Sequence, residues 1–222
     1  MINTSIVLMG RASCRVVGNG VDAGCFAMAD ADRFQVTPYP GQTYVLAVAG
    51  ITQKKGGPAL LAVATSLGRV APVLGIVATG PVAQEFQPAV ALLPNLLSVP
   101  RGFPDPQMHR LVRGAAALVL SEYEGFGIPA LEAMAAGVPV VAANRAALPE
   151  VVGEAGLLVE PQDAAAIAEL LVDVSTDSAD RVRLIERGRV HAAGFRWASC
   201  VDRLTAALTE FGPTYAGGAG KS

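Results

Sequence analysis

The stretch SEYEGFGIPALEAMAAGVP (121–139) decides the fold of this chain. The apolar run AALVLS (116–121) leads into it and predicts a buried parallel strand. The residues from Pro129 to Ala136 predict a helix, because proline suits a first helical turn, where its missing N–H costs no hydrogen bond. Between strand and helix, Gly125 and Gly127 permit positive φ angles and the close approach of another molecule. The stretch therefore predicts a strand, a glycine turn and a helix.

This predicted unit has the features of an anion site. Unpaired backbone amides and the positive end of the helix dipole meet at a helix N-terminus. Glu124 stands at the mouth of the predicted helix, and Glu132 about one turn into it. We expect phosphate on the amides and hydroxyl-bearing groups on the two carboxylates.

The composition favours a single α/β core. The chain has 222 residues, of which 52% are hydrophobic and 16% charged, with a formal net charge of −2. This length allows one substantial core, or one domain with an appendage. The continuous runs of Ala, Val and Leu fit a parallel sheet covered by helices on both faces. A pI near 5.7 and 5% aromatic residues give no electrostatic footprint for nucleic acid.

Targeting and cysteine signals are weak. The N-terminus lacks the basic and apolar regions of a signal peptide. Every apolar run is interrupted before the roughly 20 residues that a membrane span needs. Cys14, Cys25 and Cys200 are odd in number and far apart, which argues against both a disulfide framework and a metal knuckle. We expect a reduced, cytoplasmic protein with at most peripheral membrane contact.

The remaining pattern alternates strands with helices. TYVLAVAG (43–50), the loop ITQKKGG and the helical pattern at 58–70 predict the first strand–loop–helix unit of a doubly wound sheet. Further strands are predicted within 71–80, 116–121, 137–144 and 156–161, and further helices at 105–114, 148–156, 163–174 and 178–193 and from about 195. The segment 82–103 predicts a helix, a short strand and a loop in that order. Asp163 is the expected N-cap of the helix at 163–174.

The motif region resembles a known family. EGFGIPALEAMAAGVPVVAANRAALPEVV (124–152) is similar to the signature of retaining GT-B glycosyltransferases, in which seven residues separate two glutamates. The resemblance implies a doubly wound, Rossmann-like parallel sheet, the C-terminal half of a GT-B enzyme. It also implies transfer of a hexose from a nucleotide-diphospho-sugar to an acceptor that the sequence does not identify, with retention of configuration.

The same resemblance assigns roles to residues. Glu124 is expected on hydroxyls of the transferred sugar and Glu132 on the ribose, while Lys55 holds the diphosphate together with backbone amides. Those amides belong to Gly125, Phe126, Gly127 and Ile128. Glu124 and Lys55 are the expected catalytic residues. No metal and no other cofactor is expected.

Two loops depart from the family pattern or match it weakly. Gly50 occupies the place of a diphosphate-binding arginine, and Lys54 offers a replacement charge. The loop that lines the nucleobase would consist of Arg101, Gly102 and Phe103. Base identity therefore does not follow from the sequence.

The resemblance also predicts the domain organisation. NGVD and Phe26 (19–26) resemble the hinge that joins the acceptor domain to the donor domain. We expect 1–40 to be a remnant of an N-terminal domain and hinge, 41–211 to be the donor-binding domain and 212–222 to be a disordered tail. The expected lack of an acceptor domain predicts an acceptor-domain partner or self-association over an exposed apolar face.

Other interpretations of the same residues remain open. A glycoside hydrolase also needs two carboxyl groups, about 5–9.5 Å apart, although it does not need a phosphate-shaped turn between them. A non-catalytic nucleotide-sugar-binding module, or a truncated remnant of an enzyme, would keep the same motif. Asp30-Ala31-Asp32 resembles a metal-binding DxD but is interpreted as solvated charge.

Overall fold

The computed structural model describes residues 7–9, 14–22, 43–48, 50–99, 105–120 and 124–215. Its centre is a parallel six-stranded sheet with the order β5-β4-β3-β6-β7-β8. The strands are β3 (Tyr44–Val48), β4 (Gly75–Thr79), β5 (Leu96–Val99), β6 (Ala117–Leu120), β7 (Val140–Ala143) and β8 (Leu157–Val159). The chain builds outward from β3 to one edge and then from β6 to the other. This order confirms the predicted doubly wound fold.

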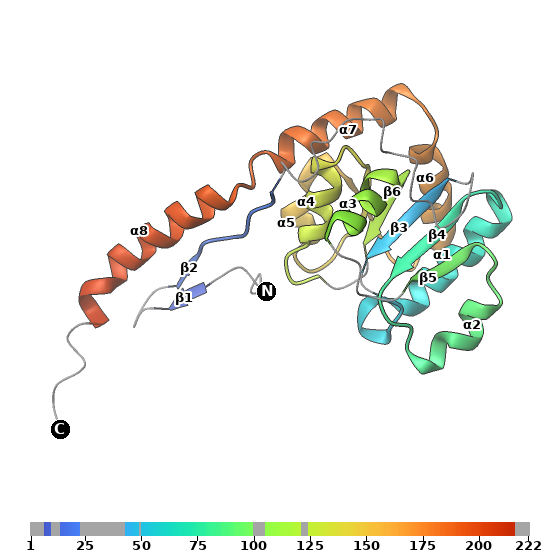
Figure 1. Ribbon diagram of the computed structural model, residues 1–222, viewed down its shortest axis with the longest axis horizontal. Coiled ribbons are helices and arrows are strands. Elements are labelled where there is room, and N and C mark those ends of the chain that lie inside the picture. Colours follow the sequence, from blue (N-terminus) through green and yellow to red (C-terminus); the bar gives the residue numbers. More distant parts are fainter. Residues whose placement is uncertain are drawn as a thin grey trace.

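Helices cover both faces of the sheet (Figure 1). One face carries α1 (Gly57–Val70), α2 (Gln87–Ala91) and α6 (Ala164–Ser175), and the other carries α3 (Asp105–Gly114), α4 (Ile128–Ala135) and α5 (Leu148–Val152). α7 (Ala179–Ala192) contributes Leu184 to the core of the first face and Ala192 to the core of the second. Short 3-10 turns are η3 (Gln53–Lys55), η4 (Gln84–Phe86) and η5 (Gly153–Ala155).

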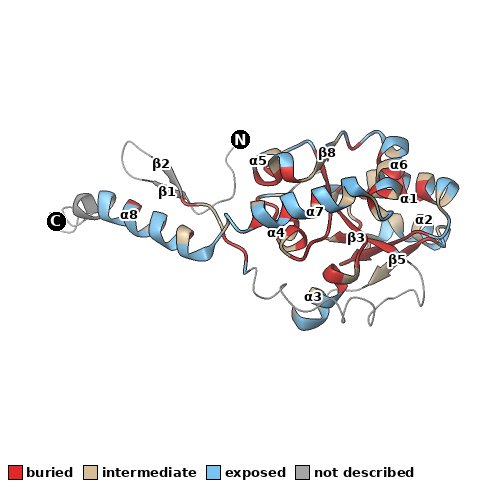
Figure 2. Cartoon of the chain, turned by 90° about the horizontal axis from the view of Figure 1, so that it is seen from above, coloured by how far each residue is buried: buried red, intermediate tan, exposed pale blue. Residues whose placement is uncertain are grey.

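Strand alternation explains why the sheet needs cover on both sides. Along β3, Tyr44 and Leu46 enter the core beneath α3 and α4, whereas Val45 and Ala47 enter the core beneath α1 and α6. All four of these residues are buried. Figure 2 shows the buried strands between helices whose outer faces are exposed. The continuous apolar runs of the sequence correspond to these strands.

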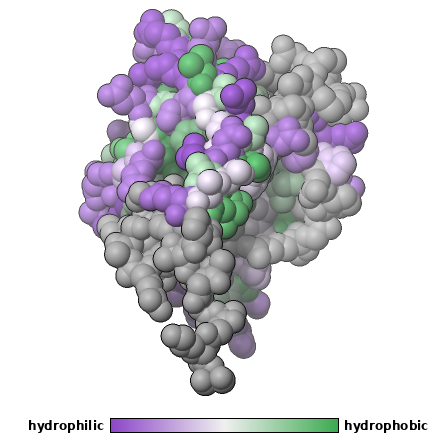
Figure 3. All heavy atoms as spheres, turned by 90° about the vertical axis from the view of Figure 1, so that its left-hand side faces the viewer, coloured by the Kyte–Doolittle hydropathy of each residue, from purple (hydrophilic) through white to green (hydrophobic). Residues whose placement is uncertain are grey.

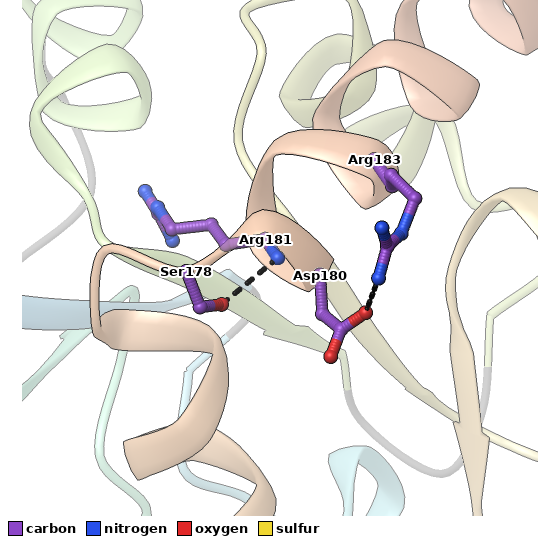
Figure 4. Close-up of polar contacts among 4 residues, drawn as sticks. All are labelled: Ser178, Asp180, Arg181 and Arg183. Carbon is purple, nitrogen blue, oxygen red and sulfur yellow. Dashed lines mark hydrogen bonds and ion pairs between the residues drawn. The ribbon is translucent and has the colours of Figure 1, made fainter.

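Side-chain caps fix the starts of two helices. The backbone amide of Ala166 donates to Asp163 Oδ1 at 3.0 Å, which confirms the predicted N-cap of α6. Ser178 caps α7 by accepting a hydrogen bond from the Arg181 amide at 3.1 Å (Figure 4). Beside it, Arg183 pairs with Asp180 on the exposed first turn of α7 (Figure 4).

A long C-terminal helix extends away from the sheet. α8 (Trp197–Tyr215) lies beside residues 14–22, and the two leave the domain together (Figure 1). Arg203 Nε donates to Val17 O at 2.8 Å, and Cys200 Sγ donates to Gly18 O at 3.2 Å. We call residues 14–22 and α8 the arm. β2 (Cys14–Val16) of the arm pairs antiparallel with β1 (Val7–Met9).

The helix corrects one boundary. The predicted domain ended at residue 211 and the tail from 212 was expected to be disordered, but α8 continues to Tyr215. The helical spacing of Leu204, Leu208 and Phe211 carries the periodic pattern into this region, and the Gly-Pro pair at 212–213 does not end the helix.

The arm exposes apolar side chains. Trp197, Val201 and Leu208 on α8 are 48%, 54% and 52% exposed. Viewed from the arm end, green apolar residues stand among purple polar ones (Figure 3). In the described ranges, no helix has both the length and the apolar character to cross a membrane.

Candidate functional site

The site lies where the sheet order reverses. After β3 the chain continues toward one edge, and after β6 toward the other, so the loops that follow these neighbouring strands diverge. In open α/β sheets this divergence forms a crevice at the carboxyl ends of the strands, where ligands bind. Lys55 belongs to the loop after β3, and Glu124 to the loop after β6.

The two charged side chains meet across this crevice. Lys55 Nζ lies 3.0 Å from Glu124 Oε1, although the residues are 69 positions apart. Their side chains are 27% and 12% exposed, so the pair is partly withdrawn from water. The structure thus brings together Lys55 and Glu124, the two residues that the family resemblance predicts to be catalytic.

The glycine turn leads directly into α4. Gly127 has a φ of 101° and occupies the N-cap position of α4, with Pro129 in the first turn, as predicted. No side chain caps this helix. A Cβ on Gly127 would lie 2.9 Å from Leu148 Cδ2, so the turn also packs closely against α5.

Backbone donors collect at this turn. Among the described backbone hydrogen bonds, the amides of Phe126, Gly127 and Ile128 have no carbonyl acceptor, while the next amide, Ala130, donates to Gly127 O at 2.9 Å. Gly125 is exposed and Phe126 is buried, so the loop faces solvent at one residue and the core at the next. Amides at the N-terminus of a helix are the groups with which proteins bind anions.

Glu132 lies in the second turn of α4 and is partly buried. It follows Ile128 by four residues, so both side chains project from the same side of the helix. Its position one turn beyond the glycine turn agrees with the sequence prediction.

Gly50 contributes backbone and leaves no room for a side chain. Its φ is 83°, and a Cβ built on it would lie 2.5 Å from the carbonyl oxygen of Pro81. The neighbouring Ile51 amide donates to that same oxygen at 2.9 Å, which fixes the approach. An arginine is therefore sterically excluded at position 50 on this backbone. Lys54 is exposed on η3, one residue before Lys55.

Several predicted features lie outside the described residues. Arg101, Gly102 and Phe103 are among them, as are Ser121 to Tyr123 and Asp30 to Asp32. The nucleobase assignment stays a prediction. Across the described ranges, no group of three or more His, Cys, Asp or Glu residues could hold a metal ion. The expectation of a metal-free site also stays a prediction.

A small apolar pocket borders the lysine. Its volume is about 50 Å³. Lys55 lines it, together with apolar side chains near the ends of several strands: Val48, Val119, Ala143 and Val159. That volume holds only a few water molecules. Gly50 and Lys55 line the pocket but Glu124 does not, so the pocket borders the Lys55–Glu124 pair on the lysine side.

Sequence reasoning missed one supporting residue. Phe195, between α7 and α8, lies behind the glycine turn with its ring against that of Phe126. In the sequence, Phe195 opens the segment FRWASCVDRL (195–204), which predicts a helix and resembles the helix with which the GT-B family returns to its N-terminal domain. A contact across 69 residues leaves no periodic signal in the chain, so nothing in the pattern could have paired these two rings.

The chain is thus a doubly wound α/β domain with a glycine turn and a Lys–Glu pair at the switch point of its sheet. Residues 28–191 match the family model described as "Glycosyl transferases group 1", and the chain belongs to this family. The fold is that of a GT-B glycosyltransferase C-terminal domain.

Three known proteins illustrate the similarity. The chain is 34% identical over 221 residues to D-inositol 3-phosphate glycosyltransferase 1 of Catenulispora acidiphila, covering 90% of this chain and 53% of that protein. It is 44% identical over 101 residues to O-antigen chain mannosyltransferase B of Escherichia coli, covering 45% of this chain and 26% of that protein. The solved C-terminal domain of a glycosyl transferase group 1 family protein (LpcC) from Francisella tularensis superposes with a TM-score of 0.66 at 25% identity, covering 79% and 97% of the two chains. The chain thus spans about half, or less, of the curated relatives it matches.

Proposed function

We propose that this chain is the donor-binding domain of a retaining glycosyltransferase that transfers a hexose from a nucleotide-diphospho-sugar. The observation that carries the proposal is the Lys55–Glu124 pair, 3.0 Å apart, at the switch point of the sheet. It lies at the mouth of the turn that leads into the uncapped N-terminus of α4. Membership of the glycosyltransferase family supports the transferase class.

The roles follow from the charges. The Lys55 ammonium and the amides of Phe126 to Ile128 provide positive potential and hydrogen-bond donors for a diphosphate. Glu124 and Glu132 supply acceptors for hydroxyl groups, Glu124 on the transferred sugar and Glu132 on the ribose. Glu124 then lies next to the diphosphate through its contact with Lys55.

Catalysis would be electrostatic. The bond between the sugar carbon and the diphosphate oxygen breaks, and negative charge develops on the departing nucleoside diphosphate. The lysine and the amides stabilise that charge without having to reorganise. The acceptor oxygen bonds to the same sugar carbon with retained configuration and gives its proton to the departing diphosphate.

One observation favours a second candidate, a binding module without turnover. Position 50 cannot carry the second cation that the family places beside the diphosphate. A charge-assisted hydrogen bond contributes about 1.5–3 kcal/mol, so its loss weakens the hold on the leaving group. The exposed Lys54 is the nearest replacement along the chain.

The arm provides a surface for further contacts. Trp197, Val201 and Leu208 are about half exposed along α8. We propose that an acceptor domain, a partner that supplies one or a second copy of the chain covers them.

Calorimetric titration with UDP, GDP, ADP and dTDP, and with their hexose conjugates, tests the site. Mannose conjugates come first, because one relative is named as a mannosyltransferase. Lys55→Ala should weaken binding of the preferred diphosphate about 10- to 100-fold, as loss of one charge-assisted bond implies. Glu132→Ala should weaken binding as well.

Arg183→Ala is the matched control. It removes an exposed cation near the start of α7, on a different element from Lys55 and Glu124, and should leave affinity unchanged. Equal losses in Lys55→Ala and Arg183→Ala would mean that the lysine acts only through overall charge. No binding of any nucleotide would overturn the proposed function. Transfer to a mannosyl or inositol phosphate acceptor would separate a transferase from a binding module.

A further inference from the structure

The glycine turn is joined to the arm by an aromatic contact. Phe126, in the middle of the turn, is only 8% exposed. Its ring meets that of Phe195 edge to face, with the ring centroids 6.2 Å apart and an interplanar angle of 73°. Phe195 lies at the junction of α7 and α8, where the arm leaves the domain.

Phe195 is held from a second side by α7 and α5. The His191 ring lies 5.2 Å from the Phe195 ring, centroid to centroid. His191 Nε2 is itself 2.7 Å from the carbonyl oxygen of Val151 in α5. Because both rings are packed, Phe195 has little freedom to shift independently of Phe126.

The backbone of Phe195 holds the N-terminal segment of the arm. Its carbonyl accepts the Val21 amide at 2.8 Å. Next to it, a Cβ on Gly20 would lie 2.4 Å from the backbone nitrogen of Trp197, so this crossing tolerates no side chain. One residue therefore contacts the glycine turn with its ring and the arm with its carbonyl.

We infer that Phe195 is a positioning residue that couples diphosphate binding at the glycine turn to the seating of residues 17–21 against α8. Its ring holds Phe126 in the core, which fixes the backbone of the turn that carries the amides of residues 126–128. In return, a diphosphate bound on those amides fixes Phe126, Phe195 and the Val21 hydrogen bond. The coupling is reciprocal, as any thermodynamic coupling between two sites must be. The inference rests on the proposed function, since the ligand is the donor diphosphate.

Amide hydrogen exchange on the full chain measures this coupling. We expect the nucleoside diphosphate that binds in calorimetry to slow exchange at residues 126–130 and also at Val21. Slowed exchange at 126–130 with unchanged exchange at Val21 would overturn the coupling and leave the proposed function standing. Absence of binding in calorimetry would overturn the proposed function, and the coupling with it.

Variants separate positioning from general stability. Phe195→Leu keeps an apolar side chain but loses the edge-to-face contact, and should weaken diphosphate binding about 3- to 10-fold. It should also abolish the ligand-induced protection of Val21 while ligand at saturation still protects 126–130. Leu171→Val, buried in α6 on the opposite face of the sheet, is the control and should preserve both affinity and protection at Val21.

A double-mutant cycle completes the test. Phe126→Leu and Phe195→Leu should each weaken binding, and the double variant should lose little more than either single variant, because both changes remove one contact. Additive losses, or an unchanged affinity in Phe195→Leu, would overturn the proposal.

Discussion

The two loops that face each other at the switch point are built alike. Each ends in a glycine with a left-handed backbone, Gly56 with a φ of 70° before α1 and Gly127 with a φ of 101° before α4. Each is followed by a helix that has proline in its first turn and no side-chain cap. The same local device thus opens two helices on opposite faces of the sheet.

The loops differ in how they satisfy their amides. Before α1, the amides of Lys55 and Gly57 both donate to the carbonyl oxygen of Thr52, at 3.1 and 2.8 Å. Before α4, the corresponding donors have no described backbone acceptor. The loop before α1 bonds its own amides, which leaves its side chain Lys55 to contact a ligand. The loop before α4 can instead contact a ligand with its backbone amides. In the proposed site, the first loop therefore contributes the Lys55 side chain and the second contributes backbone amides.

The largest expected effect is on the turn that starts the first loop. Gly50→Ala places a Cβ 2.5 Å from the Pro81 oxygen at a φ of 83°. Backbone strain and overpacking together should lower the free energy of unfolding by about 3 kcal/mol. Urea denaturation monitored by circular dichroism measures the loss.

Gly125→Ala in the second loop is the matched control for this change. Gly125 is exposed and does not have a positive φ, so its substitution should change stability by less than about 0.5 kcal/mol. If both variants unfolded at the wild-type urea concentration, the first loop would not be constrained as the structure indicates.

Local features of the fold could be predicted from the sequence. The helix predicted at 105–114 has the observed bounds, and Asp163 caps α6 as expected. These features depend on periodicity and capping, which neighbouring residues determine. The family resemblance placed Lys55 and Glu124 in the same site.

Long-range features could not be predicted. The direct Lys55–Glu124 contact and the Phe126–Phe195 contact depend on how distant elements pack in three dimensions. The exclusion of a side chain at Gly50 depends on Pro81, 31 positions away, at the end of a neighbouring strand. Such contacts leave no local pattern. The tail from 212 was predicted to be disordered, whereas α8 continues to Tyr215.

A smaller effect on stability is expected at the N-terminal ends of β3 and β6, opposite the ends that carry the site. Tyr44 begins β3, is buried, and its hydroxyl donates to Leu111 O in α3 at 2.7 Å. Its carbonyl accepts the Ala116 amide just before β6, at 2.8 Å. Tyr44→Phe leaves the Leu111 oxygen without this donor and should lower the free energy of unfolding by about 1 kcal/mol. Thermal unfolding measures the change.

The pH dependence of the free energy of unfolding tests whether the Tyr44 hydroxyl is the source of this stabilisation. Burial raises the pKa of Tyr44 above its ordinary value of 10.0, so the folded state keeps a proton that the unfolded chain loses in alkali. The stabilisation is therefore fully present below pH 10 and declines as pH rises above it. The stability difference between the wild type and Tyr44→Phe should shrink above that pH. A constant difference up to pH 11 would rule out this titration.

The smallest expected effect follows from removing the negative charge that pairs the two loops. Glu124→Gln keeps the shape of the side chain but removes the anion that holds Lys55 at 3.0 Å. A partly exposed ion pair is worth about 0.2–1 kcal/mol, so releasing the lysine should tighten binding of a free nucleoside diphosphate by up to about fivefold. The preference for the hexose conjugate over the free diphosphate should fall at the same time, because a neutral amide accepts weaker hydrogen bonds from sugar hydroxyls. Calorimetry at low ionic strength measures both affinities, and Glu169→Gln on the exposed face of α6 controls for the change in net charge. Weaker binding of the free diphosphate in Glu124→Gln would show instead that the carboxylate positions the lysine. Both loops would then contribute to diphosphate binding through side chains.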